Sequence, residues 1–411
     1  MKIRWIKLIV CLIFVQPLFC QNNTVGIKSE VNFESNSLNF DFINSLLYGG
    51  KINEETKNNW INLCKQENKI YSIFKNDFFF KRKFNENTLN FIISDINKID
   101  IVFNKDLLKL ALNGNFDYQD QTLNFDNTHI RIERYQKYNL QYEFNSKEKL
   151  ILIGLAYLKG NHNINLNINQ GSLYTALYGE YLDINYDING YITDTSNINL
   201  FQNNGNGVAL DFDVKFNAGA NTINFYINDL GFIKWNKNSI NFAADSTFSF
   251  IGIDIDNIYD FNDSIFNNIV DDQDYINNQK NSYKSFVSAN IGFNIKTNSS
   301  IKKFNHFIFG LHSKWQPYIF KKDKLSNLIS NGFSQSNYKP LFYISSEMGH
   351  KKIKLLPRLS YGGYSEDLNI ELAIKIESKI SLILGTKHLE DLIINEGSKS
   401  FSLFLNIYKI L

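Results

Sequence analysis

Apolar and polar residues alternate along residues 207–235. Val208 and Leu210 fall on one face of an extended chain and Ala209 and Asp211 on the other, because successive side chains of a β-strand point to opposite faces. The alternation resumes after a turn predicted at residues 217–219, so the segment predicts a β-hairpin. Its apolar face either covers a protein core, as in a β-sandwich, or contacts lipid, as in an outer-membrane barrel.

The same alternation recurs from one end of the chain to the other, and the clearest runs are at residues 38–42, 138–144, 182–188, 287–295, 368–376 and 401–407. Many runs reach about 9 to 11 residues, the length that a tilted strand needs to cross a bilayer, whereas soluble strands average nearer 5 or 6. We count roughly fourteen to sixteen such segments and predict fourteen strands, because single-chain outer-membrane barrels usually have an even number. Strand length therefore favours the barrel over the sandwich.

Polar segments separate the runs. Residues 145–148 and 377–379 predict tight turns. Beyond residue 20 the only prolines are at positions 317, 340 and 357, so little interrupts the predicted ladders. Two longer insertions, residues 263–281 and 322–339, are predicted to be surface loops, and in barrels of this kind the long loops lie on the external side.

Two segments near the N-terminus, residues 53–66 and 104–113, have helical spacing instead. Each begins with an asparagine that can cap a helix. In the first, Trp60, Leu63 and Cys64 share one face, which predicts that Cys64 is a buried small side chain rather than a reactive thiol. The two helices either plug the lumen of the barrel or connect strands outside it, and the sequence does not separate these placements.

Residues 1–20 contain three basic residues ahead of an apolar run that ends at Phe19, followed by Cys20. This pattern predicts a signal peptide that is cleaved after Cys20. The apolar run is shorter than the roughly 20 residues of a membrane-spanning helix. Lipidation of Cys20 is the alternative, but Phe19 stands where lipoprotein signals carry a small residue. Residues 21–411 are then predicted to form a single barrel domain.

Charge and cysteine content narrow the classes of partner. The chain has 43 basic and 41 acidic residues, and three of the basic ones lie in the predicted signal peptide. The exported chain is therefore nearly neutral, which argues against nucleic acid as a partner. Two of the three cysteines also lie in that peptide, so no internal disulfide is predicted. The mean hydropathy of −0.26, with 22 tyrosines and 35 phenylalanines, is typical of strands with one wet face and aromatic girdles.

The sequence shows no motif for catalysis or metal binding. The six histidines, at positions 129, 162, 306, 312, 350 and 388, lack close metal spacing, and His306 and His312 would lie about 20 Å apart on one strand. The acidic residues at 271, 272 and 274 lack the glycine and glutamate of an EF-hand loop. His312 and Ser313 point to opposite faces of a strand, so they cannot form a catalytic dyad. We predict no catalytic, cofactor-binding or metal-binding residues; a hydrolase triad drawn from distant strands is the alternative that this pattern would not reveal.

An aromatic belt at the membrane interface is predicted from Tyr226, Phe232 and Trp235, with a turn or bulge at residues 229–231. Contact of these residues with a ligand is the alternative. The stretch LSYGGYS, residues 359–365, predicts a glycine bend between strands.

The chain resembles a family of uncharacterised Bacteroidota outer-membrane proteins. The resemblance rests on these stretches and on LNFDFINSLLYGGKI (38–52), KDLLKLALNGN (105–115), LYTALYGEYL (173–182) and LILGTKHLEDLI (382–393), and it covers nearly all of the mature chain. That family looks like a distant relative of the FadL-type long-chain fatty acid transporters and of the PorV barrel of the type IX secretion system. The resemblance implies location and architecture but assigns no chemistry. Fatty acid transport does not transfer by motif, because the Asn-Pro-Ala element of the transporter hatch has no counterpart before Pro317.

These patterns predict an all-β protein, a transmembrane antiparallel up-and-down β-barrel of about 14 strands with short N-terminal helical elements. We expect it in the outer membrane of a Gram-negative bacterium, in contact with lipid, as a non-enzymatic protein without a cofactor. Its expected role is passage of a small or hydrophobic solute, or membership of a secretion or motility assembly with type IX secretion components as partners. A secreted soluble β-rich adhesin or carbohydrate-binding protein is the alternative.

Overall fold

The computed structural model describes residues 23–39, 41–42, 44–45, 49, 52–194, 202–251, 277–298, 304–318, 325–350, 352–393 and 398–411. The predicted signal peptide, the acidic group at 271–274 and the first part of each long insertion lie outside these residues.

The described strands are β1 (Asn23–Ser35), β2 (Glu67–Phe84), β3 (Asn87–Asn104), β4 (Gln121–Asn124), β5 (Thr128–Asn145), β6 (Lys149–Thr175), β7 (Leu182–Ile192), β8 (Gly205–Ala218), β9 (Asn221–Trp235), β10 (Ile240–Phe250), β11 (Asn277–Lys280), β12 (Lys284–Phe286), β13 (Ala289–Asn298), β14 (Phe304–Trp315), β15 (Lys339–His350), β16 (Ile353–Gly363), β17 (Asp367–Ile376), β18 (Ser381–Thr386) and β19 (Ser400–Ile410). The described helices are α3 (Glu54–Leu63), α4 (Lys105–Asn113), α6 (Leu325–Ser334) and α7 (Leu389–Ile393), with the short 3-10 helices η1 (Phe116–Tyr118) and η2 (Leu177–Gly179).

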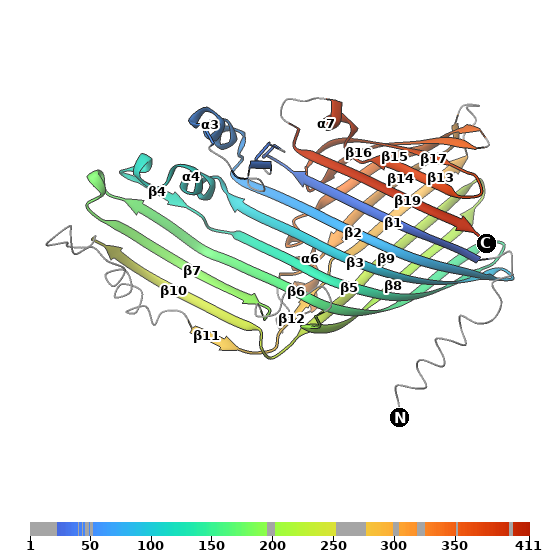
Figure 1. Ribbon diagram of the computed structural model, residues 1–411, viewed down its shortest axis with the longest axis horizontal. Helices are drawn as coiled ribbons and strands as arrows, with labels where there is room; N and C mark the ends of the chain where they lie inside the picture. The colour runs from blue at the N-terminus through green and yellow to red at the C-terminus, as the bar shows by residue number, and fades with distance from the viewer. Residues whose placement is uncertain are drawn as a thin grey trace.

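The strands form one antiparallel sheet that closes on itself (Figure 1). β1 pairs with β2 on one side and with β19 on the other, which seals the ring. Some strands with separate labels together form one row of the sheet. β4 and β5 share a row because both pair with one side of β6, and β7 and β8 share a row because both pair with its other side. β9 and β10 form one row, and β11, β12 and β13 form another. The described strands therefore make fourteen rows, as predicted.

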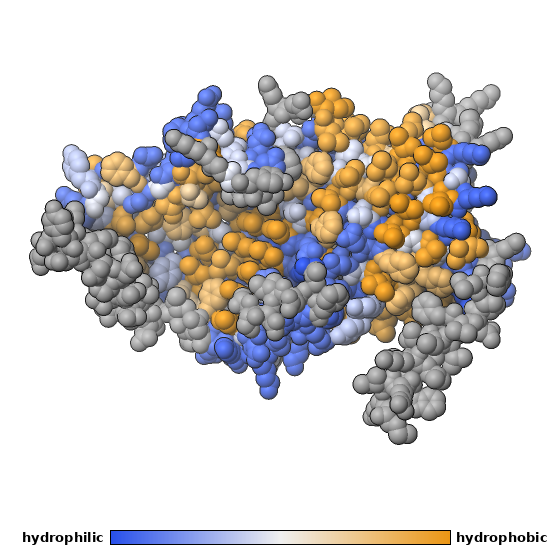
Figure 2. Space-filling view, in the orientation of Figure 1, coloured by the Kyte–Doolittle hydropathy of each residue, from blue (hydrophilic) through white to orange (hydrophobic). Residues whose placement is uncertain are grey.

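The barrel exposes its apolar side chains and buries its polar ones. In β8, Leu210 is 54% exposed whereas Asp211 is only 3% exposed, and Leu155, the partner of Leu210 in β6, is 61% exposed. Figure 2 shows such apolar side chains gathered over the outer surface of the wall. A soluble protein has the opposite arrangement, so the outer face of this sheet contacts lipid. The predicted barrel is confirmed, and the chain does not form a soluble sandwich.

Tight turns gather at one end of the barrel, where both β1 begins and β19 ends (Figure 1). The turn at residues 146–148 was predicted, and so was that after Ile376. The opening hairpin turns at Gly219 and Ala220, slightly later than predicted, and Gly219 has a φ of +63° that favours glycine. The longer, helix-bearing connections lie at the other end, which in barrels of this class is the external end. None of the described helices is long and apolar enough to cross a membrane.

Helices α3 and α4 form as predicted but lie outside the lumen. Asn53 accepts a hydrogen bond from the backbone N–H of Thr56 at 2.7 Å and so caps α3. Trp60 of α3 packs in one apolar cluster with Phe33 and Ile70. Glu34 and Tyr71 line the lumen, and successive side chains of a strand point to opposite faces. Phe33 and Ile70, which precede them in the chain, therefore point to the outer surface. Of the two placements expected, the helices therefore occupy the connecting one, over the outer surface.

A bulge in β9 turns Trp235, one residue of the predicted aromatic belt, toward the lumen. The pairing of β8 with β9 shifts register opposite Asp229, whose φ is +64°. One extra residue exchanges the two faces, so Trp235 points inward, is only 1% exposed and donates its indole N–H to Ser285 at 2.8 Å. Tyr226, before the bulge, also lines the lumen. The bulge was predicted correctly, but the belt was wrong for these two residues.

Candidate functional site

The connection between β14 and β15 crosses the lumen. Residues 316–318, before α6, and residues 335–338, after it, contact inward-facing side chains of β3, β5 and β6 on the far side of the ring. We call these two stretches the plug. The insertion at 322–339 was predicted to be an external loop, and this prediction is wrong for its last residues, because their polar groups bind charged groups of the lumen wall.

Gln316 is the centre of the first contact. Its side-chain amide donates hydrogen bonds to both carboxylate oxygens of Glu133, at 2.9 and 3.1 Å, and to the carbonyl oxygen of Phe286 at 2.8 Å. Its own carbonyl oxygen accepts a hydrogen bond from the ammonium of Lys98. Lys98 and Glu133 also form an ion pair at 3.6 Å, and both are almost fully buried. A neutral amide thus bridges a buried ion pair.

A second ion pair holds the other half of the plug. Asp100 and Arg131 lie opposite each other on β3 and β5, with 3.6 Å between Oδ2 and Nη1. Arg131 donates from Nη2 to the backbone oxygen of Gln335 at 3.0 Å. Asn337 donates from Nδ2 to Asp100 at 3.0 Å. Buried charges need such partners, and the wall and the plug supply them together.

Tyr318 joins the two stretches of the plug. Its hydroxyl donates to the side-chain oxygen of Asn337 at 2.8 Å. Its ring stacks on His129 of the wall, with the centroids 3.5 Å apart. Asn165 of β6 donates to its backbone oxygen at 2.5 Å. Contacts with β5 and β6 therefore hold Tyr318 across the lumen.

Between the plug and the tight turns, the inner wall encloses a cavity of about 320 Å³. Its lining is polar and charged, and includes Glu30, Glu34, Lys75, Lys314, Arg358 and Glu371. A second cavity of about 360 Å³ shares part of this lining, and a third of about 310 Å³ continues from it toward the tight-turn end. Most of the residues that line these three cavities are polar or charged.

Most charges in this cavity are paired across strands. Arg358 lies 3.3 Å from Glu371, and Lys387 forms an ion pair with Glu30. Lys314, from β14, differs: it donates to the hydroxyl of Tyr71 at 3.1 Å and has no carboxylate within ion-pair distance among the described residues.

A separate network holds the polar face of the opening hairpin. Asp211 lies 3.1 Å from the ammonium of Lys137 and accepts hydrogen bonds from Asn139 at 2.6 Å and Gln141 at 2.9 Å. Lys137 also pairs with Asp229, the residue of the bulge. The charges of β8 thus bind the inner wall, which explains why this face of the hairpin points inward.

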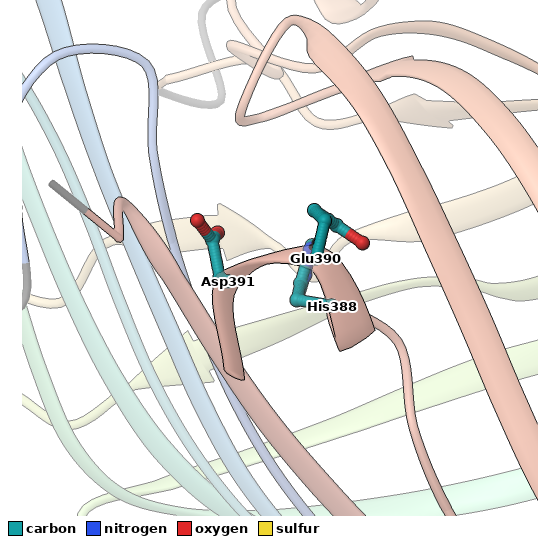
Figure 3. Close-up of side chains that lie close together, drawn as sticks. All are labelled: His388, Glu390 and Asp391. Atoms are coloured by element: carbon teal, nitrogen blue, oxygen red, sulfur yellow. Dashed lines mark ion pairs between the residues drawn. The ribbon is translucent and has the colours of Figure 1, made fainter. Parts of the chain in front are cut away.

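His388, Glu390 and Asp391 come close together at the start of α7, as Figure 3 shows, and their ligand atoms lie within 4.8 Å of one another. Each already has a protein partner. Glu390 accepts from the backbone N–H of Ile370 at 2.7 Å, and Asp391 accepts from backbone groups of Lys399 and Ser400. The Nδ1 atom of His388 lies 3.0 Å from the side-chain oxygen of Asn369. Most of the atoms that would bind a cation therefore already have protein partners.

The same cluster instead fastens α7 to the barrel. Nε2 of His388 lies 3.7 Å from Glu34 of β1. Burial alone would lower the pKa of His388, but the hydrogen bonds and charges of Glu34 and Glu390 prevail and raise it to about 9. His388 is therefore an imidazolium at neutral pH and links two carboxylates.

The other residues singled out in the sequence have structural surroundings. Cys64 is buried, and burial raises the pKa of its thiol to about 11, as expected of an unreactive side chain. His312 lines the cavity and lies 3.0 Å from the hydroxyl of Tyr226. The plug contacts were missed, although charges alternate with isoleucine in NKIDI (97–101) and HIRIE (129–133). That alternation marks inward-facing charge but does not name its partner.

A closed ring of strands with an apolar outer surface and a charged interior defines a transmembrane β-barrel of the outer-membrane type. The chain belongs to a family described as "Family of unknown function (DUF5723)", whose profile matches residues 21–345. No curated protein matches the chain.

Among solved structures, the chain is similar in fold to a mutant of the monoaromatic hydrocarbon channel TodX, with 5% identity and a TM-score of 0.41 over 95% of this chain and 91% of that one. It is also similar to a FadL homologue of Pseudomonas aeruginosa, with 6% identity and a TM-score of 0.41 over 95% and 90%. A mutant porin of Rh. blastica gives 6% identity and a TM-score of 0.24 over 94% and 98%.

Proposed function

We propose that the protein is a non-enzymatic outer-membrane channel for a small polar solute and that the plug closes it in this conformation. One observation carries the proposal: a lipid-facing barrel holds a charged cavity, and the segment above that cavity is fixed by hydrogen bonds to the wall. Water can replace such bonds when the plug moves.

The lining favours a polar solute over a hydrophobic one. Sites for apolar ligands are lined mainly by apolar and aromatic side chains with few polar groups. Here ion pairs such as Arg358–Glu371 project into the cavity. An apolar solute would displace water from these charges without replacing its hydrogen bonds, which opposes binding.

We further propose that residues 1–20 direct export and are removed, and that the barrel resides in the outer membrane of a Gram-negative bacterium. The basic and apolar pattern of this peptide supports export. The exposed apolar band on the strands supports insertion in a bilayer.

A disulfide lock tests the channel. Asp100→Cys with Asn337→Cys replaces a wall-to-plug hydrogen bond of 3.0 Å by a bond that dithiothreitol can cleave. Reconstituted in liposomes, the oxidised variant should show no swelling with glycerol, arabinose, glycine or lactate, and reduction should restore it. Toluene should not partition through the barrel faster than through plain liposomes.

The matched control is Asn90→Cys with Gln141→Cys, because these residues also face each other on β3 and β5 and hydrogen bond at 2.7 Å, but neither contacts the plug. Its swelling should not depend on dithiothreitol. Equal swelling of the locked variant in both redox states would contradict the gate, and no swelling of any form would contradict passage.

The second candidate is a membrane component of a secretion or motility assembly. It is favoured by exposed side chains on the connections at the external end, where Tyr178 is 86% and Phe116 is 72% exposed. The locked variant separates the two roles in a deletion strain: an assembly component should restore secretion or motility with the plug oxidised, whereas a channel should not restore solute uptake.

A further inference from the structure

Lys314 is the cation of the cavity lining that makes no direct ion pair among the described residues. Its neighbours contact carboxylates, Lys387 at Glu30 and Arg358 at Glu371, while His388 lies between Glu34 and Glu390. Lys75 lies 3.3 Å from Asp77. Among the described residues, no carboxylate lies within 4 Å of the Lys314 ammonium, so this ammonium makes no direct ion pair with the wall.

Aromatic rings hold this ammonium in place. Its nitrogen lies 4.5 Å from the ring centroid of Tyr71, 4.8 Å from that of Tyr364 and 5.2 Å from that of Tyr338. Tyr71 and Tyr364 stack at 3.7 Å, which fixes the geometry of the group. Contacts with aromatic rings stabilise a cation less than an ion pair with a desolvated carboxylate does.

A lysine ammonium has three donor hydrogens, and the structure assigns one of them to the hydroxyl of Tyr71. Lys314 also lines the 320 Å³ cavity, so its remaining donors have open space before them. An ammonium without a direct ion pair can bind one carboxylate of a ligand. A phosphate dianion would bring a second negative charge beside Glu30 and Glu34 of the same lining, whereas a carboxylate brings only one.

We propose that this cavity binds a small organic monocarboxylate, with the carboxylate on Lys314. Ser360, which lines the same space, supplies a hydroxyl for a polar group elsewhere on the ligand. The proposal rests on the proposed function, since it names the class of solute that the channel would pass.

The site is also connected to the plug. Tyr338 is the last residue of the plug and one of the three rings around Lys314. A carboxylate that draws the ammonium into the cavity weakens its contact with this ring. Bound ligand therefore favours release of the plug at Tyr338, in the direction that opens the lumen.

The test is a saturation-transfer NMR titration of the full barrel in detergent with lactate, at low salt because salt screens the interaction. Wild-type protein should bind lactate, and it should bind glycerol and ethylamine more weakly. Inorganic phosphate is measured by its displacement of lactate and should also bind more weakly. Lys314→Met should weaken lactate binding at least tenfold, about 1.4 kcal/mol. Lys314→Arg should retain it, since the positive charge remains.

Lys215→Met is the matched control, because Lys215 also faces the lumen but lies in the third cavity beside Asp213. It should bind lactate like the wild type. The heat-dependent shift of the folded barrel on gels verifies that each variant folds. Equal lactate binding by Lys314→Met and wild type would overturn the proposal, and so would tighter binding of phosphate.

Binding and swelling together distinguish an error in the proposed monocarboxylate site from an error in the proposed channel. Lactate-driven swelling of liposomes without detectable binding would overturn the monocarboxylate site and leave the channel. Binding that depends on Lys314 without swelling, even with the plug unlocked, would support the site and overturn the channel.

Discussion

Replacement of Gln316 by alanine should open the lumen. Gln316 joins the plug to the buried pair of Lys98 and Glu133 through three side-chain contacts, and a fourth reaches the backbone of Phe286. Gln316→Ala removes all four and leaves the ion pair at 3.6 Å on the wall. The substitution therefore destabilises the closed state, which contains these hydrogen bonds. It has little effect on the free energy of the open state, in which water solvates the same groups.

The size of the effect follows from the partners. A hydrogen bond to a charged group contributes about 1.5 to 3 kcal/mol, and Gln316 bonds to two charged side chains. Water that enters the vacated space recovers part of this sum. We expect a net loss of about 3 kcal/mol for the closed state, which raises the ratio of open to closed barrel on the order of a hundredfold.

Single-channel conductance in planar bilayers measures that ratio, and hydrogen exchange of residues 335–338 reports release of the plug. Gln141→Ala is the matched control, because Gln141 also faces the lumen and hydrogen bonds to Asp211 at 2.9 Å but does not contact the plug. Gln316→Ala should conduct more often and exchange faster, and the control should do neither. Unchanged conductance and exchange in Gln316→Ala would refute the assignment of this contact as the gate.

Three further changes test other parts of the structure. Leu210→Arg, at an outward position that is 54% exposed, should lower the free energy of unfolding in lipid by about 2 to 4 kcal/mol, measured by urea titration in vesicles; a change within about 0.5 kcal/mol, as on a wet surface, would contradict lipid contact there. Trp235→Ala should cost about 3 to 5 kcal/mol in the same assay, since the ring is buried and stacked near Tyr283, and a loss below about 1 kcal/mol would argue against its inward position. His388, with a pKa raised to about 9, should stabilise α7 fully below its unfolded pKa near 6.5 and lose this stabilisation as the pH rises through about 9. Hydrogen exchange of residues 389–393, compared on a common intrinsic-rate scale, should show that loss in the wild type but not in His388→Gln, and equal pH dependence in both would count against the link.

The local parts of this architecture could be predicted from the sequence. A period of two identifies a strand and its two faces, and the asparagine caps at 53 and 104 begin helices where expected. Most of the fourteen rows contain a run long enough to cross a bilayer, although β18 has only six residues. Parity, however, holds only until a bulge: beyond Asp229 the faces exchange, so Trp235 was assigned to the wrong side.

The plug could not be predicted in this way, because its contacts join residues far apart in the chain. Gln316 meets Glu133 across 183 residues, and Asn337 meets Asp100 across 237. The alternation in β3 and β5 shows that charges face the lumen, but a lumen-facing charge binds water as readily as protein. Only the closed ring brings the β14–β15 connection near these strands.

The placement of the charges bears on how the plug can move. Lys98 is paired with Glu133, and Asp100 with Arg131, and both pairs lie within the wall. Withdrawal of the plug therefore breaks hydrogen bonds but separates neither pair, so it leaves no isolated charge in the lumen. If the plug itself carried one partner of each pair, opening would leave two buried charges without partners, at a cost of several kcal/mol each. A neutral plug over a self-paired wall would therefore let the channel that we propose open at moderate cost.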